Sequence, residues 1–136
     1  MRFMVLMISA VYQPQNRKKL EAGFTPDPEM MDKMGKFSDD LKAKGALISL
    51  DGLQPPSAGA RLSFSKGQVK FTDGPAIKAK EVLGGYWILK AKSKRDVIEW
   101  MKRCPAQDGD IIEIRPIFEG DELPRKSKVA ARSRKS

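Results

Sequence analysis

The chain has 136 residues, of which 40% are hydrophobic and 32% charged, the balance of an ordinary soluble protein that folds as one domain. It contains no histidine and one cysteine, which excludes Ser-His-Asp and Cys-His catalysis, histidine-containing zinc sites and an intrachain disulfide. Its longest apolar run, residues 3–8, is far shorter than the ~20 residues of a membrane-spanning helix and its start is not typical of a signal peptide, so we expect a cytoplasmic protein without membrane contact.

The net charge of +9 is concentrated at the C-terminal end. Residues 124–136 contain six of the 26 basic residues and no acid, so residues 1–123 hold 20 basic and 17 acidic residues, a net charge of +3. We expect residues 1–123 to form the domain and residues 124–136 a disordered tail that makes weak, nonspecific contact with nucleic acid. No spaced acidic loop is present, so neither a metal nor a cofactor is expected.

Residues 2–10 are predicted to form the first strand, because they are apolar at both alternating positions and so suit a central strand covered on two sides. After a polar connection, a helix is predicted between Asp27, which suits an N-cap, and Gly45, which suits a left-handed C-terminal cap. Pro28 stands at the first helical position. The apolar stripe of this helix consists of Met30, Met34, Phe37 and Leu41.

A second strand is predicted at residues 46–53, followed by a proline-rich turn at residues 54–60. The next residues, 61–65 and 68–72, alternate polar and apolar side chains around Lys66-Gly67, a pattern typical of a β-hairpin. The alternation places four apolar side chains on one hairpin face, namely Leu62, Phe64, Val69 and Phe71.

Three further elements complete the chain: a strand at residues 84–91, a helix at residues 93–105 and a last strand at residues 110–119. Ser93 and Asp96 have the spacing of a capping box, and Pro105 is predicted to end the helix. The lone cysteine lies near the end of this helix, and we interpret it as a packing residue.

This order of elements predicts an α+β protein with a ferredoxin-like plan: an antiparallel sheet with its helices on one face and an inserted β-hairpin. Such a sheet leaves its other face uncovered, whereas the first strand is apolar on both faces. We therefore expect a homodimer in which two sheets pack face to face.

Two acids at strand ends are candidate catalytic residues, because Asp73 and Asp51 each fall on an apolar phase of their strand. Each is a candidate general base, but a turn role is more typical of both, since a glycine follows each of them. Candidate ligand-binding residues are the charged Arg61, Lys80 and Glu81 and the aromatic Tyr12, Tyr86 and Trp87. Tyr86 and Trp87 are neighbours on one strand, so one of them is expected to face the helices and the other a cavity between the two sheets of the dimer.

Four blocks of the sequence together match a known pattern: residues 34–62, 71–75, 78–105 and 112–119. They resemble the YCII-related proteins, in the branch named after its Asp-Gly-Pro-Phe (DGPF) motif, in register over roughly residues 3–119. The resemblance implies a dimeric α+β barrel. It also implies a family of mostly unassigned function, in which one member type removes chloride from a hydroxylated aromatic ring.

In some family members a His-Asp pair has been proposed as an active site, and members of this branch occur beside or fused to extracytoplasmic-function sigma factors. This chain departs from the pattern. The motif's Phe and Glu are replaced by Ala76 and Lys78, and Asp108 stands where a histidine is usual. The His-Asp pair therefore cannot operate here.

Two hypotheses for the function remain. The first is a homodimeric small-molecule-binding or accessory and regulatory module, functionally linked to an extracytoplasmic-function sigma factor. The second is a cofactor-independent enzyme, similar to a lyase or dehydrochlorinase, that acts on small hydroxylated or aromatic metabolites. In the enzyme, Asp73 or Asp51 would be the base, and Arg61 or Lys80 would stabilise an oxyanion. The lost motif residues favour the first hypothesis.

Overall fold

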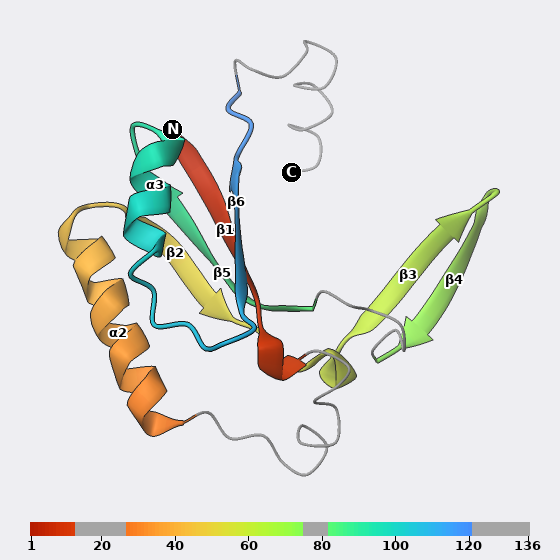
Figure 1. Cartoon of the computed structure of the whole chain (residues 1–136). Helices are drawn as coiled ribbons and strands as arrows, with labels where there is room; N and C mark the ends of the chain where they lie inside the picture. Colours follow the sequence, from red (N-terminus) through yellow and green to blue (C-terminus); the bar gives the residue numbers. More distant parts are fainter. Residues whose placement is uncertain (13–26, 75–81, 121–136) are drawn as a thin grey trace.

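The computed structural model describes residues 1–12, 27–74 and 82–120 (Figure 1). The predicted tail at 124–136 and the motif positions at 75–81 lie outside these residues. In chain order the helices and strands are β1 (Arg2–Ile8), α2 (Pro28–Ala43), β2 (Leu47–Gly52), β3 (Ala60–Ser65), β4 (Gln68–Asp73), β5 (Leu83–Lys90), α3 (Lys94–Met101) and β6 (Ile111–Pro116). Short 3₁₀ turns at Ala10–Tyr12 and Pro56–Ala58 follow β1 and β2.

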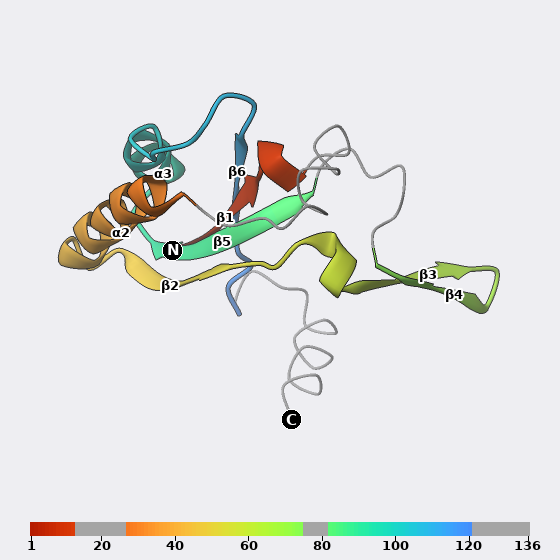
Figure 2. The ribbon, with the colours of Figure 1, turned by 90° about the horizontal axis from the view of Figure 1, so that it is seen from below.

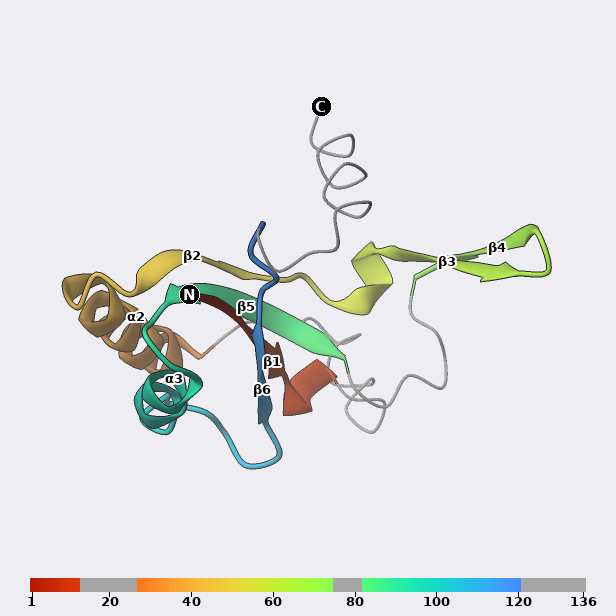
Figure 3. The same ribbon diagram turned by 90° about the horizontal axis from the view of Figure 1, so that it is seen from above.

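Four strands form one antiparallel sheet in the order β2-β5-β1-β6. Both helices lie on the same face of this sheet (Figures 1 and 2). The strand order and the one-sided helix layer are those of the ferredoxin-like α+β fold, so the predicted fold class is confirmed. The hairpin β3–β4 forms a separate two-stranded sheet and projects away from the body (Figure 3).

Local signals set both ends of α2. The Asp27 carboxylate accepts a hydrogen bond from the Glu29 N–H at 3.0 Å, and Gly45 has a φ of 71° that favours glycine. The C-terminal end of the second helix was predicted less well. After Met101 the N–H groups of Arg103 and Cys104 bond three residues back, so the chain tightens into 3₁₀ turns before it reaches the predicted end.

The hydrophobic core lies between the sheet and the two helices. Two side chains of the predicted stripe on α2, Phe37 and Leu41, are buried there. The largest fully buried side chains come from β1, α2, β5 and α3, and they are Phe3, Val5, Leu41, Leu89 and Val97. The helices therefore cover the face of the sheet that carries Phe3 and Val5.

The opposite face of the sheet carries a second set of apolar side chains. In the strand register, Met4 lies opposite Ile88 and Leu6 opposite Tyr86, and all four side chains are half-buried. We call these four residues the open face, because no described element covers them. Charged side chains surround it, including Arg2, Lys90, Glu113 and Arg115. Strand β1 is thus apolar on both faces, as its sequence indicates.

Candidate functional site

A hydrogen-bonded pair of side chains lies at one end of the open face. Asp51 near the end of β2 lies opposite Tyr86 of β5 in the strand ladder, and the Tyr86 hydroxyl donates a hydrogen bond to Asp51 Oδ2 at 2.7 Å. Tyr86 is also opposite Leu6, so both side chains share the face that the helices leave uncovered. We call these two residues the Asp51–Tyr86 pair.

A register shift within β2 explains why Asp51 is on this face. Leu47 is opposite Leu89 on the helix-covered face, but two residues later Ser49 is opposite Ile88 on the open face. An extra residue in one strand reverses the facing of the residues that follow it. The phase predicted for Asp51 assumed an unbroken alternation, which would place Asp51 on the same face as Leu47, and it is therefore wrong.

Two glycines permit the close approach of the strands beside this pair. A Cβ atom on Gly85 would lie 2.9 Å from the backbone oxygen of Asp51, and one on Gly84 would lie 2.8 Å from the Cβ atom of Ser9. Neither separation is one that real Cβ atoms adopt. The Gly84-Gly85 dipeptide is thus the sequence signal that marks this end of the sheet.

Tyr12 lies at the same end of the sheet, on the 3₁₀ turn that follows β1. Its hydroxyl donates to the carbonyl oxygen of Leu53 at 2.8 Å, and the Leu53 N–H bonds to the carbonyl oxygen of Gly84 at 2.9 Å. Burial raises the pKa of Tyr12 above its ordinary value of 10.0. Tyr12 therefore ties the turn to the residue that follows β2.

The Asp51–Tyr86 pair has a defined electrostatic character. The hydrogen bond to Asp51 is the largest cause that raises the pKa of Tyr86 above 10.0, followed by burial and by the negative charge of Asp51. The phenol therefore keeps its proton at neutral pH and donates it to the carboxylate. The remaining carboxylate lone pairs and the phenolic oxygen are acceptors suited to a ligand hydroxyl.

We predict that Asp51→Ala lowers the pKa of Tyr86 toward 10.0. The chain has two tyrosines, so a Tyr12→Phe background isolates Tyr86 in an ultraviolet titration of the phenolate. The pKa of Tyr86 is higher in the folded than in the unfolded chain, so the hydrogen bond to Asp51 stabilises the fold at pH values below 10.0. This contribution is lost as the pH rises through the raised pKa of Tyr86. If the pKa of Tyr86 is the same with and without Asp51→Ala, the hydrogen bond to Asp51 is not what raises it.

Asp73 and Arg61 do not join the pair, because they belong to the separate β3–β4 sheet. Asp73 is exposed, and its carboxylate makes no hydrogen bond or ion pair within the described residues. Asp73 shares a face with Val69 and Phe71, the apolar phase predicted for it, but no described element covers that face. The next residue, Gly74, has a φ of 84°, and its N–H bonds to the carbonyl oxygen of Gly59 at 2.8 Å, which extends the hairpin pairing by one step.

The remaining predicted ligand-binding residues divide between the core and the undescribed segment. Trp87 is 5% exposed on the helix-covered face, where it meets Phe37 edge to face with ring centroids 6.5 Å apart. Its indole nitrogen has no hydrogen-bond partner in the described parts of the chain. Tyr86 and Trp87 thus occupy opposite faces, and Trp87 is a core residue. Lys80 and Glu81 lie outside the described residues.

The Cys104 thiol stays protonated at neutral pH. Burial, with a smaller contribution from the charge of Asp110, raises the pKa of Cys104 to about 11. We predict that iodoacetamide alkylates the native thiol near pH 8 about 100-fold more slowly than it alkylates the denatured chain, because the thiolate is the reactive form. Equal rates in the native and denatured protein would show that the thiol is not shielded.

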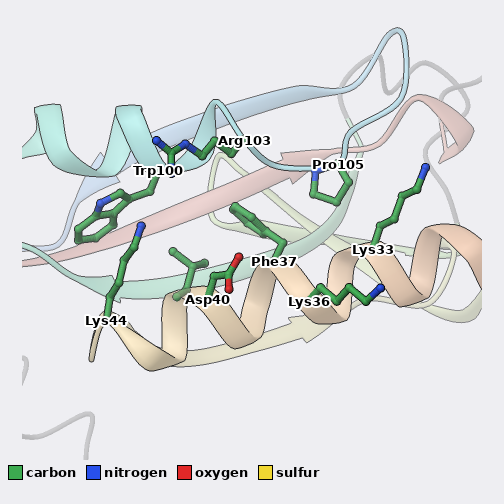
Figure 4. A pocket seen from close by; sticks show the side chains of 9 residues that line it. Lys33, Lys36, Phe37, Asp40, Lys44, Trp100, Arg103 and Pro105 are labelled. Carbon is green, nitrogen blue, oxygen red and sulfur yellow. The ribbon is translucent and has the colours of Figure 1, made fainter.

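A groove of about 290 Å³ between α2 and the α3 end is a second candidate site (Figure 4). Four of its lining side chains are cationic and one is acidic. They are Lys33, Lys36, Phe37, Asp40, Leu41, Lys44, Trp100, Arg103 and Pro105. No groove was expected here from the sequence. Its charged residues Lys33, Lys36 and Asp40 nevertheless recur at spacings that place them on one face of α2.

Three of the four cations of the groove already have neighbours. Lys33 Nζ is 3.5 Å from the Glu29 carboxylate, and the corresponding contact from Lys36 to Asp32 is 3.4 Å. Lys44 Nζ lies 5.5 Å from the centroid of the Trp100 ring. An incoming anion would compete with these partners, so the Asp51–Tyr86 pair is the stronger candidate.

The described residues hold neither a metal-binding cluster nor a membrane-spanning helix. No group of three or more His, Cys, Asp or Glu side chains there is arranged to hold a metal ion. In the same residues no helix is long and apolar enough to cross a membrane.

The sheet order and helix layer define a ferredoxin-like α+β protein, with a carboxylate–phenol pair on the uncovered face of its sheet. A sequence model of the YCII-related domain matches residues 1–121. The chain therefore belongs to the YCII-related family. A comparison with curated protein sequences found no significant match.

Proposed function

We propose that this YCII-related protein is a cytoplasmic, homodimeric module that binds a small molecule and serves an accessory or regulatory role. The observation that carries the proposal is the Asp51–Tyr86 pair at the end of an apolar sheet face. An apolar surface with a few directed polar groups is the usual make-up of a small-molecule site. The ligand class that fits is a small hydroxylated or aromatic metabolite.

The open face supports the homodimer. Met4, Leu6 and Ile88 present apolar surface on the side of the sheet that the helices leave bare. A second copy of the same face offers matching apolar surface, and a two-fold arrangement satisfies both copies at once. Such packing places the Asp51–Tyr86 pair at the border of the interface, where a ligand is shielded from water.

The dimer is tested with Leu6→Arg, which inserts a charge into the open face. We expect this variant to sediment as a monomer at concentrations where the unaltered protein is a dimer, because a long charged side chain is costly to bury in an apolar interface. Met31→Arg is the control, since Met31 lies on α2 and is 60% exposed. A monomeric unaltered protein would refute the proposed dimer.

Ligand binding is tested with hydroxylated benzoates, with 4-hydroxybenzoate as the first probe, by calorimetry and NMR line broadening. Asp51→Asn and Tyr86→Phe should each weaken binding about 10- to 100-fold, the usual effect of losing a hydrogen bond to a charged group. Asp39→Asn on the exposed surface of α2 is the control. If the unaltered protein and the three variants bind the probe with equal affinity, the Asp51–Tyr86 pair is not part of the binding site.

The same pair also favours a second candidate function, a cofactor-independent enzyme. A carboxylate bonded to a protonated phenol provides a base and an acid within 2.7 Å of each other. Turnover of a hydroxylated aromatic compound that Asp51→Asn abolishes would favour the enzyme, whereas binding without turnover favours the regulatory module. In the latter case a functional link to an extracytoplasmic-function sigma factor is part of the proposal.

A further inference from the structure

The hairpin β3–β4, residues Ala60–Asp73, exposes a complete apolar face. We call this hairpin the arm. Leu62 pairs with Phe71 and Phe64 with Val69 across the two strands, so the four side chains lie together on one face. Each is between 55% and 74% exposed. A contiguous patch of this kind marks an interaction surface, whereas single exposed apolar residues do not.

The arm is a formed structure with a fixed register. Lys66 and Gly67 have φ values of 49° and 77°, the left-handed pair that a tight hairpin turn requires. Six consecutive residue pairs follow from this turn down to Ala60 and Asp73. The opposite face of the arm is polar and includes Arg61, Ser63, Ser65, Gln68 and Lys70.

The described body of the chain does not cover the apolar face of the arm. β3 and β4 pair only with each other, and the arm extends beyond the main sheet in all three views (Figures 1, 2 and 3). An isolated two-stranded hairpin is at best marginally stable in water. Its defined register together with a bare apolar face therefore indicates that another surface packs against it.

The size of the proposed dimer interface indicates what that surface is. A stable interface usually takes about 20–30 residues from each partner, and the uncovered face of the main sheet offers about a dozen. The arm supplies additional apolar side chains to each copy. The arm follows β2 through the 3₁₀ turn Pro56–Ala58, and the hydrogen bond from the Gly74 N–H to the Gly59 carbonyl oxygen closes its base.

We infer that the apolar face of the arm packs against the partner protomer, so that two copies of this chain exchange arms across a two-fold axis. The inference rests on the homodimer proposed above and adds a second contact to it. A two-fold exchange covers both arms in a single association step, because each arm meets the equivalent surface of the other copy. The arm then anchors the dimer with Phe64 and Phe71, aromatic side chains of the kind that dominate interface energies.

The experiment compares dimer dissociation constants by sedimentation equilibrium. Phe64→Asp combined with Phe71→Asp should raise the constant about 30-fold or more, as expected for the loss of central aromatic anchors. Ser63→Asp combined with Ser65→Asp adds the same two charges to the polar face of the same arm and should leave the constant within about threefold. Both variants keep the main core intact, since the arm residues are exposed.

A photo-crosslinking amino acid in place of Phe64 provides a second measurement, in a mixture of isotope-labelled and unlabelled protein. Crosslinks that join a labelled to an unlabelled chain support the inference. Crosslinks confined to one chain overturn it, and so does an arm-dependent binding of a monomer to phosphatidylglycerol vesicles. If the Phe64 and Phe71 variant dimerises normally while Leu6→Arg does not, the arm inference fails and the sheet-face dimer stands. If the unaltered protein is monomeric, both fail.

Discussion

Replacement of Phe3 by alanine is expected to lower the free energy of unfolding by about 3–5 kcal/mol, the usual cost of truncating a buried phenylalanine. Phe3 lies on β1, one of the two central strands of the sheet, and is 0% exposed beneath the helices. Its removal leaves a cavity among rigid neighbours, because β1 is held by hydrogen bonds to β5 and β6 on its two sides. Urea denaturation followed by tryptophan fluorescence measures the change at one fixed protein concentration.

Phe118→Ala provides a matched control for this substitution. Phe118 lies within the last strand predicted at residues 110–119, but β6 ends at Pro116 and the Phe118 side chain is 69% exposed. Its truncation should change the free energy of unfolding by less than about 0.5 kcal/mol. Equal losses in the two variants would show that burial of Phe3 is not what stabilises the sheet.

Replacement of Gly85 by alanine is the second large expected effect, a loss of about 1–3 kcal/mol of stability from overpacking. The new Cβ atom would lie 2.9 Å from the backbone oxygen of Asp51 on the neighbouring strand. Backbone cannot rotate away as a side chain does, so the β2–β5 ladder has to move apart. This movement should also lengthen the hydrogen bond between Tyr86 and Asp51, and the pKa of Tyr86 should fall accordingly.

Gly35→Ala is the opposite case and serves as the control. Gly35 lies inside α2, and a Cβ atom there meets nothing within 4 Å. Alanine is the better helix former by about 0.8–1 kcal/mol, so this substitution should stabilise the protein. Stabilisation by Gly85→Ala, or destabilisation by Gly35→Ala, would contradict the assigned environments.

Much of the fold could be predicted because its signals are local. Asp27 and Gly45 bound α2, and Lys66-Gly67 forms the hairpin turn with the φ values that such a turn demands. The two apolar faces of β1 indicated a central strand. The end of the second helix was predicted too late, because the 3₁₀ turns after Met101 depend on how the chain leaves the helix and not on the position of Pro105.

The candidate site was predicted only in part. Asp51 and Tyr86 were both named from the sequence, but their contact joins residues 35 positions apart and depends on the register shift in β2. Asp73 was placed on the apolar phase of the hairpin, and it does share a face with Val69 and Phe71. That face is exposed and not covered, because the hairpin forms a sheet of its own.

The sequence by itself determined the elements, their order and hence the ferredoxin-like α+β class. These follow from caps, turn residues and hydrophobic periodicity within single segments, whose physics acts over a few residues. Only the tertiary structure decided that Asp51 faces Tyr86 on the open face and that the arm stands apart from the body. The physical reason is that side-chain facing in a sheet depends on the pairing of strands distant in sequence, and one inserted residue reverses it.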